Sequence, residues 1–214
     1  MAAAIRSISC VLYTLYADAA PLHKACMIHT PSVLVIAGSL RPRRIAIQIA
    51  DWVAEVGRDT IEAAFEVVDL KDWPLPMDDE PGVPAGGVYE FEHTRAWSRK
   101  IAAADAFVFV TPQYNWGYPA ALKNALDHLY GEWAGKPTMI VTYGGHGGGR
   151  CAEQLQQVCQ GLHMTVLATK PGLTLTREQI ETNSGVIDPT TQFRPHLDDL
   201  RQAFGELAAA RTPT

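Results

Sequence analysis

Short strand-like segments alternate with longer segments of helical periodicity from residue 33 onward. Apolar or alternating segments of strand length span residues 33–37, 65–70, 106–110, 138–142 and 164–168. Apolar residues recur at helical spacing within residues 45–56, 93–104, 118–129, 150–162 and 194–210. Because neighbouring parallel strands need a crossover and are covered on both faces, this succession predicts an α/β fold in three layers.

The number of strands and the loop after the first one narrow the topology. Five strands joined by right-handed crossovers predict a parallel sheet in the order 2-1-3-4-5. The six-stranded dinucleotide fold is not favoured, since the chain has no GxGxxG sequence after its first strand. Residues 73–91 are rich in proline, glycine and acidic side chains, so they predict a long surface segment. We expect one domain over residues 32–211.

Charge and cysteine usage exclude some functions. The chain has 214 residues and a net charge of −5, which gives no general reason to bind nucleic acid or an anionic membrane. No apolar run approaches the roughly 20 residues of a membrane-spanning helix. The cysteines form no CxxC pair, so we expect inert thiols and a reducing, cytoplasmic location. They are Cys10, Cys26, Cys151 and Cys159.

The first 31 residues do not share the pattern of the rest. They contain a short apolar patch but only weak features of a signal or transit peptide. We expect residues 1–31 to be a disordered extension, or a segment upstream of a true start at Met27.

The loop after the first strand is suited to an anion. It contains Ser39, Arg41 and Arg44 directly before a predicted helix. A helix N-terminus offers unpaired N–H groups and the positive end of a dipole, and arginine donates paired hydrogen bonds to phosphate. The loop therefore predicts a phosphate site. The alternative is an ordinary turn with solvated arginines.

Two further loops are suited to a flat, hydrogen-bonding ligand. The loop after the third strand joins aromatic and amide side chains: Pro112, Gln113, Tyr114, Asn115, Trp116 and Gly117. The loop after the fourth strand begins with Tyr143, Gly144 and Gly145 and has five glycines, which let a backbone approach a ligand closely. Either loop could instead be a simple connector. The carboxyl ends of strands 1, 3 and 4 are neighbours in the predicted sheet, so together the loops predict a site for flavin mononucleotide (FMN).

At these positions the chain resembles the NADPH-dependent FMN reductase family of flavodoxin-like proteins. The similarity covers about residues 32–170. Residues 38–41 are similar to the family's phosphate loop, and residues 112–127 to its most specific signature, with support from 132–137 and 144–149. The chain departs from residues common in the family at Arg44, Gln113 and Trp116.

The resemblance implies an enzyme that binds FMN and uses NAD(P)H to reduce a small-molecule acceptor such as a flavin, quinone, azo dye or metal oxyanion. It also implies a homodimer or homotetramer. Ser39 and Arg41 would hold the phosphate, residues 112–117 would line the flavin ring, and Tyr143, Gly144 and Gly145 would close its other edge. No catalytic side chain is expected, because the flavin supplies the chemistry. The alternatives are a flavodoxin-type electron carrier and a flavin-free scaffold protein.

Overall fold

A parallel sheet forms the centre of the structure, a computed structural model that describes residues 29–77 and 79–210. Its strands are β1 (Ser32–Ala37), β2 (Ala64–Asp69), β3 (Ala106–Pro112), β4 (Pro137–Gly144), β5 (Thr165–Val166) and β6 (Gly172–Thr174). Their order is β2-β1-β3-β4-β5, with β6 also paired to β4. This order confirms the predicted topology 2-1-3-4-5.

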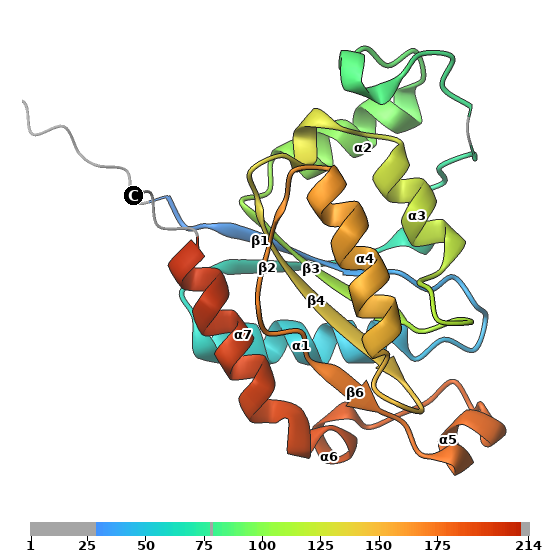
Figure 1. Cartoon of the computed structure of the whole chain (residues 1–214), viewed down its shortest axis with the longest axis vertical. Helices are drawn as coiled ribbons and strands as arrows, with labels where there is room; N and C mark the ends of the chain where they lie inside the picture. The colour runs from blue at the N-terminus through green and yellow to red at the C-terminus, as the bar shows by residue number, and fades with distance from the viewer. Residues whose placement is uncertain (1–28, 78, 211–214) are drawn as a thin grey trace, which may run out of the picture.

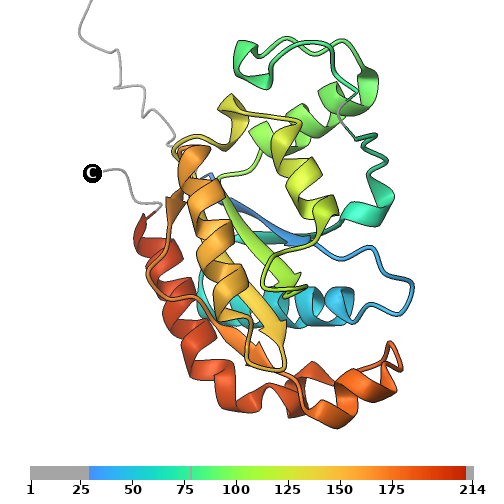
Figure 2. The same cartoon turned by 45° about the vertical axis from the view of Figure 1, so that its right-hand side comes forward.

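Helices cover both faces of the sheet (Figures 1 and 2). They are α1 (Ala46–Thr60), α2 (Glu92–Ala102), α3 (Ala120–Asp127), α4 (Gly149–Gly161), α5 (Arg177–Thr182), α6 (Pro189–Gln192) and α7 (Leu197–Ala210). One apolar core joins α1 and α7 to one face of the sheet, and a second core joins α2, α3 and α4 to the other face. The predicted three-layer arrangement is therefore confirmed.

Alternate residues of the central strands supply the two cores. In β1, Val33 and Val35 point into the core with α1 and α7, whereas Leu34 and Ile36 point into the opposite core. Strands β3 and β4 are buried along almost their whole length, which explains their continuous apolar sequences. Strand β2 lies at the edge of the sheet and is correspondingly more exposed.

The predicted fifth strand, residues 164–168, is wrong in its extent. The structure divides this edge into β5, which pairs with the start of β4, and β6, which pairs with its end. Between them the chain leaves the ladder, since the backbone N–H of Thr169 donates to the Glu206 carboxylate on α7 (2.9 Å) and Pro171 has no N–H. The final helix also begins later than expected, at Leu197 after a 3₁₀ turn.

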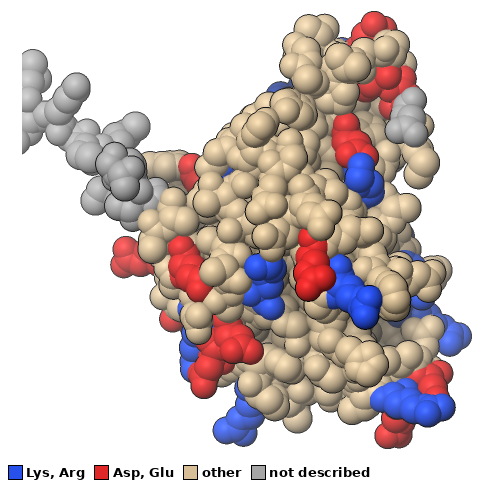
Figure 3. All heavy atoms as spheres, in the orientation of Figure 1, with Lys and Arg blue, Asp and Glu red and all other residues tan. Residues whose placement is uncertain are grey.

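Surface charge and helix length can be compared with the sequence predictions for the described residues. On the face drawn in Figure 3, basic and acidic side chains are interspersed over the lower part, as expected from the modest net charge. Within residues 29–77 and 79–210, no helix combines the length and the apolar character needed to cross a bilayer. The predictions for Cys10, Cys26 and most of segment 1–31 lie outside the described residues, which begin at His29.

Candidate functional site

The three predicted loops meet at one pocket. It has a volume of about 500 Å³ and lies at the carboxyl ends of β1, β3 and β4. This volume falls within the roughly 300–1,000 Å³ typical of cofactor and small-ligand sites. Nine of the twelve predicted site residues line it: Ser39, Arg41, Arg44, Pro112, Gln113, Tyr114, Tyr143, Gly144 and Gly145.

The first loop is in direct contact with the second. The hydroxyls of Ser39 and Tyr114 share a hydrogen bond of 2.8 Å, and the Arg41 guanidinium lies 3.8 Å above the centre of the Tyr114 ring. Ser39 is fully buried, whereas Arg41 is exposed. Helix α1 begins beside this loop, and no side chain caps its N-terminus. The backbone N–H groups of its first turn therefore remain available to an anion.

Arg44 occupies the pocket wall in an ion pair. Its Nη2 atom donates to the carboxylate of Asp69 at the end of β2, and both side chains are largely buried. Its Nε atom is buried and has no hydrogen-bond partner. A buried guanidinium N–H without a partner is costly, so a ligand acceptor at this point would be favoured.

The second loop places only its first half in the pocket. Gln113 is fixed from both sides: its N–H donates to the Tyr143 carbonyl (3.0 Å), and its side-chain oxygen accepts from the Cys151 N–H (3.1 Å). Asn115, Trp116 and Gly117 do not line the pocket.

Those three residues belong to a tight turn that projects outward. Tyr114 and Gly117 exchange two backbone hydrogen bonds of 2.7 and 2.9 Å. Asn115 and Trp116 adopt left-handed backbone conformations, with φ of 48° and 71°. Trp116 is 63% exposed, and the Arg150 guanidinium lies 3.9 Å above the centre of its ring. This turn therefore forms part of the rim rather than the lining.

The glycine loop after β4 packs tightly on the chain that follows it. A Cβ atom on Gly147 would lie 2.8 Å from the carbonyl oxygen of Gly172, so this backbone approach requires glycine. The Thr142 hydroxyl donates to the Gly147 carbonyl at 2.6 Å. Gly144 and Gly145 line the pocket, and the Gly144 carbonyl accepts from the N–H groups of Gly147 (3.1 Å) and Leu175 (2.9 Å). Next to them, burial raises the pKa of Tyr143, so its hydroxyl stays neutral.

The opposite wall was not predicted from the sequence. It consists of residues from α5 and the segment 182–187. Gln48 of α1 fixes this segment by donating to the Gly185 carbonyl (2.9 Å) and accepting from the Ile187 N–H (2.8 Å). One local signal was available: Thr176 and Gln179 form a capping box, which marks the start of α5.

The cysteines near the pocket are unsuited to nucleophilic chemistry. Both Cys151 and Cys159 are buried in the structure, as predicted. Burial raises the pKa of each thiol to about 12. The reactive thiolate form is therefore negligible at neutral pH.

Comparison with known proteins identifies the family. The model of the NADPH-dependent FMN reductase family matches residues 31–173, about two-thirds of the chain. The chain belongs to the NADPH-dependent FMN reductase family. All three loops that meet at the pocket fall within the matched residues.

Curated relatives support this family assignment. The chain is 58% identical over 181 residues to an NAD(P)H-dependent FMN reductase of Schizosaccharomyces pombe, covering 84% of this chain and 90% of the relative. It is 48% identical over 144 residues to an NAD(P)H-dependent FMN reductase of Saccharomyces cerevisiae, covering 62% and 75%. It is 31% identical over 185 residues to a quinone reductase of Escherichia coli, covering 81% and 93%.

Solved structures support the flavodoxin-like fold. The flavoenzyme NAD(P)H:(acceptor) oxidoreductase FerB from Paracoccus denitrificans superposes with a TM-score of 0.63 at 19% identity, covering 85% of this chain and 99% of that protein. An NAD(P)H:quinone oxidoreductase from Methanothermobacter marburgensis gives a TM-score of 0.59 at 17% identity, covering 84% and 100%.

Proposed function

We propose that this protein is an FMN-dependent oxidoreductase that uses NAD(P)H to reduce flavins, quinones or similar small acceptors. The observation that carries this proposal is the convergence of an arginine- and serine-containing loop, an aromatic loop and a glycine loop at one pocket of about 500 Å³. Family membership and the names of the relatives support the same conclusion. They give no support to the electron-carrier alternative.

The end of the pocket beside α1 fits a phosphate group. Arg41 supplies positively charged hydrogen-bond donors, and Ser39 and the uncapped first turn of α1 supply neutral ones at the positive end of the helix dipole. The unpartnered Nε atom of Arg44 adds another donor. We therefore assign these residues to the FMN phosphate, with Asp69 holding Arg44 in place.

The other end fits the flavin ring. Pro112, Gln113 and Tyr114 lie beside Tyr143, Gly144 and Gly145 on one side of this end, and α5 with segment 182–187 forms the other side. When bound, FMN supplies the redox chemistry by accepting a hydride from NAD(P)H and passing two electrons to an acceptor. The chain orients the ring, and we assign no catalytic side chain. Asn115, Trp116 and Gly117 would contact the nicotinamide or the acceptor at the rim.

We also propose a homodimer, or a homotetramer built from it, located in the cytoplasm. Two exposed apolar side chains line the pocket: Ile180 is 49% exposed and Val186 76%. Exposed apolar surface of this kind is typical of an interaction site, and a second copy seated on it would cover the pocket. Residues 32–211 would form the flavin-binding domain.

Steady-state kinetics with purified protein test this function. Under anaerobic conditions the FMN-loaded protein should oxidise more than one equivalent of NAD(P)H only when a quinone, azo dye or free flavin is present. Comparing NADH with NADPH and the three acceptor classes defines the preferred pair. A purified protein that takes up no added FMN, or that oxidises NAD(P)H no faster than free FMN does, would refute the proposal.

A further inference from the structure

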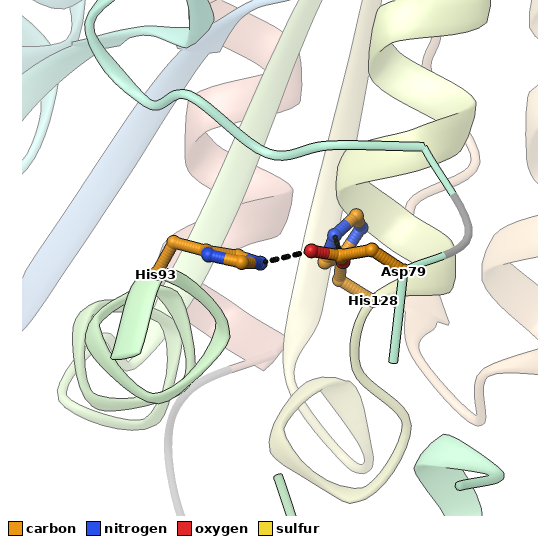
Figure 4. A group of neighbouring side chains, drawn as sticks. All are labelled: Asp79, His93 and His128. Atoms are coloured by element: carbon orange, nitrogen blue, oxygen red, sulfur yellow. Dashed lines mark ion pairs between the residues drawn. The ribbon is translucent and has the colours of Figure 1, made fainter. Parts of the chain in front are cut away.

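Three side chains from separate segments converge at a place that does not line the flavin pocket. Asp79 comes from the long surface segment 73–91, His93 from the first turn of α2, and His128 from the residue after α3. Figure 4 shows both imidazole rings directed at the Asp79 carboxylate. The His93 Nε2 atom lies 2.9 Å from one carboxylate oxygen, and the His128 Nε2 atom lies 3.7 Å from the other.

The three groups have the composition and spacing of a metal site. One ligand atom from each of Asp79, His93 and His128 lies within 4.8 Å of the other two. Atoms bound to one Zn²⁺ at about 2.0–2.2 Å in tetrahedral geometry lie roughly 3.3 Å apart. The two histidine nitrogens lie 2.9 and 3.7 Å from different oxygens of the Asp79 carboxylate, so side-chain movements within the 4.8 Å cluster would bring one atom of each residue to that spacing.

Burial without hydrogen bonds marks the same atoms. The His128 side chain is only 4% exposed, and its Nε2 atom has no hydrogen-bond partner. The Nε2 atom of His93 and an oxygen of Asp79 are also buried and lack a partner with hydrogen-bond geometry. Buried polar atoms are normally hydrogen-bonded, so three adjacent atoms without such a bond favour a ligand shared among them.

Surrounding contacts hold the imidazoles as metal ligands are usually held. The Nδ1 atom of His128 lies 2.8 Å from the Asn124 carbonyl oxygen. Donation to that carbonyl leaves the Nε2 lone pair directed at Asp79, the tautomer that a metal requires. The His93 ring stacks on Phe91, with 5.5 Å between centroids and 9° between planes.

The segment that carries Asp79 is fixed on both sides of it. The Glu80 carboxylate accepts hydrogen bonds from the N–H groups of Glu90 (2.9 Å) and Phe91 (3.1 Å), just before α2. The Asn124 amide of α3 donates to the Leu75 carbonyl at 2.9 Å. The carboxylate is therefore positioned between the two helices that carry the histidines.

We propose that Asp79, His93 and His128 bind a divalent transition-metal ion of the Zn²⁺ class. Two neutral imidazoles and one carboxylate favour such an ion over Mg²⁺ or Ca²⁺, which prefer oxygen ligands. Three protein ligands leave the fourth position to water. The ion would tie segment 73–91 to α2 and α3, at a place independent of the flavin pocket.

Metal titration of the full-length, tag-free protein tests the proposal. After treatment with a chelator, ZnCl₂ is added in the presence of a chromophoric competitor, and Co²⁺ is used in parallel for its visible absorption. We expect one tight equivalent per chain. Asp79→Asn, which keeps the side-chain shape, and His93→Ala should each weaken Zn²⁺ binding by at least about 100-fold, because outer contacts alone are worth 10–100-fold.

A matched histidine–carboxylate pair provides the control. His29 and Asp105 also lie 2.9 Å apart, but no third metal-ligating side chain joins them within the described part of the chain. His29→Ala should leave Zn²⁺ affinity unchanged. FMN content should be the same in all variants, which separates this test from that of the proposed function. Equal Zn²⁺ affinity in wild type, Asp79→Asn and His93→Ala, or an equal loss in His29→Ala, would overturn the proposal.

Discussion

The two arginines Arg41 and Arg44 have different surroundings in the loop after β1. Arg41 is exposed and lies over the Tyr114 ring, so its charge is free to meet a ligand. Arg44 is largely buried and its charge is already paired with Asp69. The sequence places both arginines beside a helix N-terminus, but it does not reveal that Asp69, 25 residues later, lies next to one of them. Arg41 is therefore the better residue for testing phosphate recognition.

Replacing Arg41 should weaken FMN binding only by removing its contact with the phosphate group. We expect Arg41→Ala to lower the affinity for FMN by about 10- to 100-fold, the value of one charge-assisted hydrogen bond. Affinity for riboflavin, which has no phosphate, should stay the same. Flavin fluorescence quenching on titration of the apoprotein measures both affinities.

A second exposed arginine serves as the control for that variant. Arg201 lies on α7 and its side chain is 56% exposed, so Arg201→Ala should bind FMN like the wild type. Equal losses of FMN and riboflavin affinity in Arg41→Ala would mean that Arg41 supports the ring or the fold, not the phosphate.

The two buried thiols should resist modification in the folded protein. In a variant with serine at positions 10 and 26, a thiol-specific disulfide reagent at pH 8 should react with Cys151 and Cys159 only after denaturant is added. Burial raises the pKa of both thiols to about 12 in the folded protein, whereas the pKa of a thiol in the unfolded chain is 9.0. As the pH rises above about 9, the unfolded chain loses these protons and the folded protein keeps them. The free energy of unfolding should therefore fall above about pH 9. Rapid reaction of two thiols in native buffer would contradict this burial.

The sequence predicts some site residues and misses others for a physical reason. Ser39 and Gln113 lie just beyond the ends of β1 and β3, and Gly144 is the last residue of β4, so the strand order alone brings them together. Trp116 and Asn115 lie in the same loop, yet a tight turn with positive φ directs them to the rim. No periodic pattern records such a turn in a non-glycine sequence.

At the scale of elements, periodicity predicts the long helices and buried strands well but not the short elements. Helices α1, α2, α4 and α7 each bury an apolar stripe, which the sequence displays. Helices α5 and α6 have only 6 and 4 residues, and neither has a buried residue. The pocket wall formed by α5 and segment 182–187 depends on the cap of α5 and on the distant side chain of Gln48, so it could not be predicted from a pattern.

Two helical glycines test how closely the elements pack. A Cβ atom on Gly57 of α1 would lie 2.5 Å from the Phe65 ring and 2.9 Å from the Phe204 ring. Overpacking of this kind costs about 1–3 kcal/mol, more than the roughly 1 kcal/mol that alanine gains in helix propensity. Gly57→Ala should therefore lower the free energy of unfolding, as measured by denaturant titration.

Gly205 provides the opposite case in α7. A Cβ atom on this exposed residue would meet nothing within 4 Å beyond the backbone of its own helix and its chain neighbours. Gly205→Ala should raise the free energy of unfolding by about 0.5–1 kcal/mol through helix propensity alone. A rise in the free energy of unfolding in both variants would show that α1 does not pack on β2 and α7 as the structure describes.

At the scale of the whole molecule, the exposed apolar side chains Ile180 and Val186 at the pocket predict that two chains associate there. We expect a mass of about 47 kDa or a multiple of it by light scattering, since a closed dimer doubles the 23.4 kDa of one chain. Val186→Glu should shift the protein toward the monomer, because Val186 is 76% exposed at the rim. Val88→Glu changes an equally exposed valine, 75%, away from the pocket and should leave the mass unchanged.

Anaerobic titration of the FMN-loaded protein with NAD(P)H tests most directly whether the converging loops bind FMN and place it to accept a hydride from NAD(P)H. With no other protein present, we expect one equivalent of NAD(P)H to bleach the visible absorption of the bound flavin. Adding a quinone should then restore the absorption. A flavin that stays oxidised with excess NADH and NADPH, or that is reduced only when a second protein is added, would contradict the account.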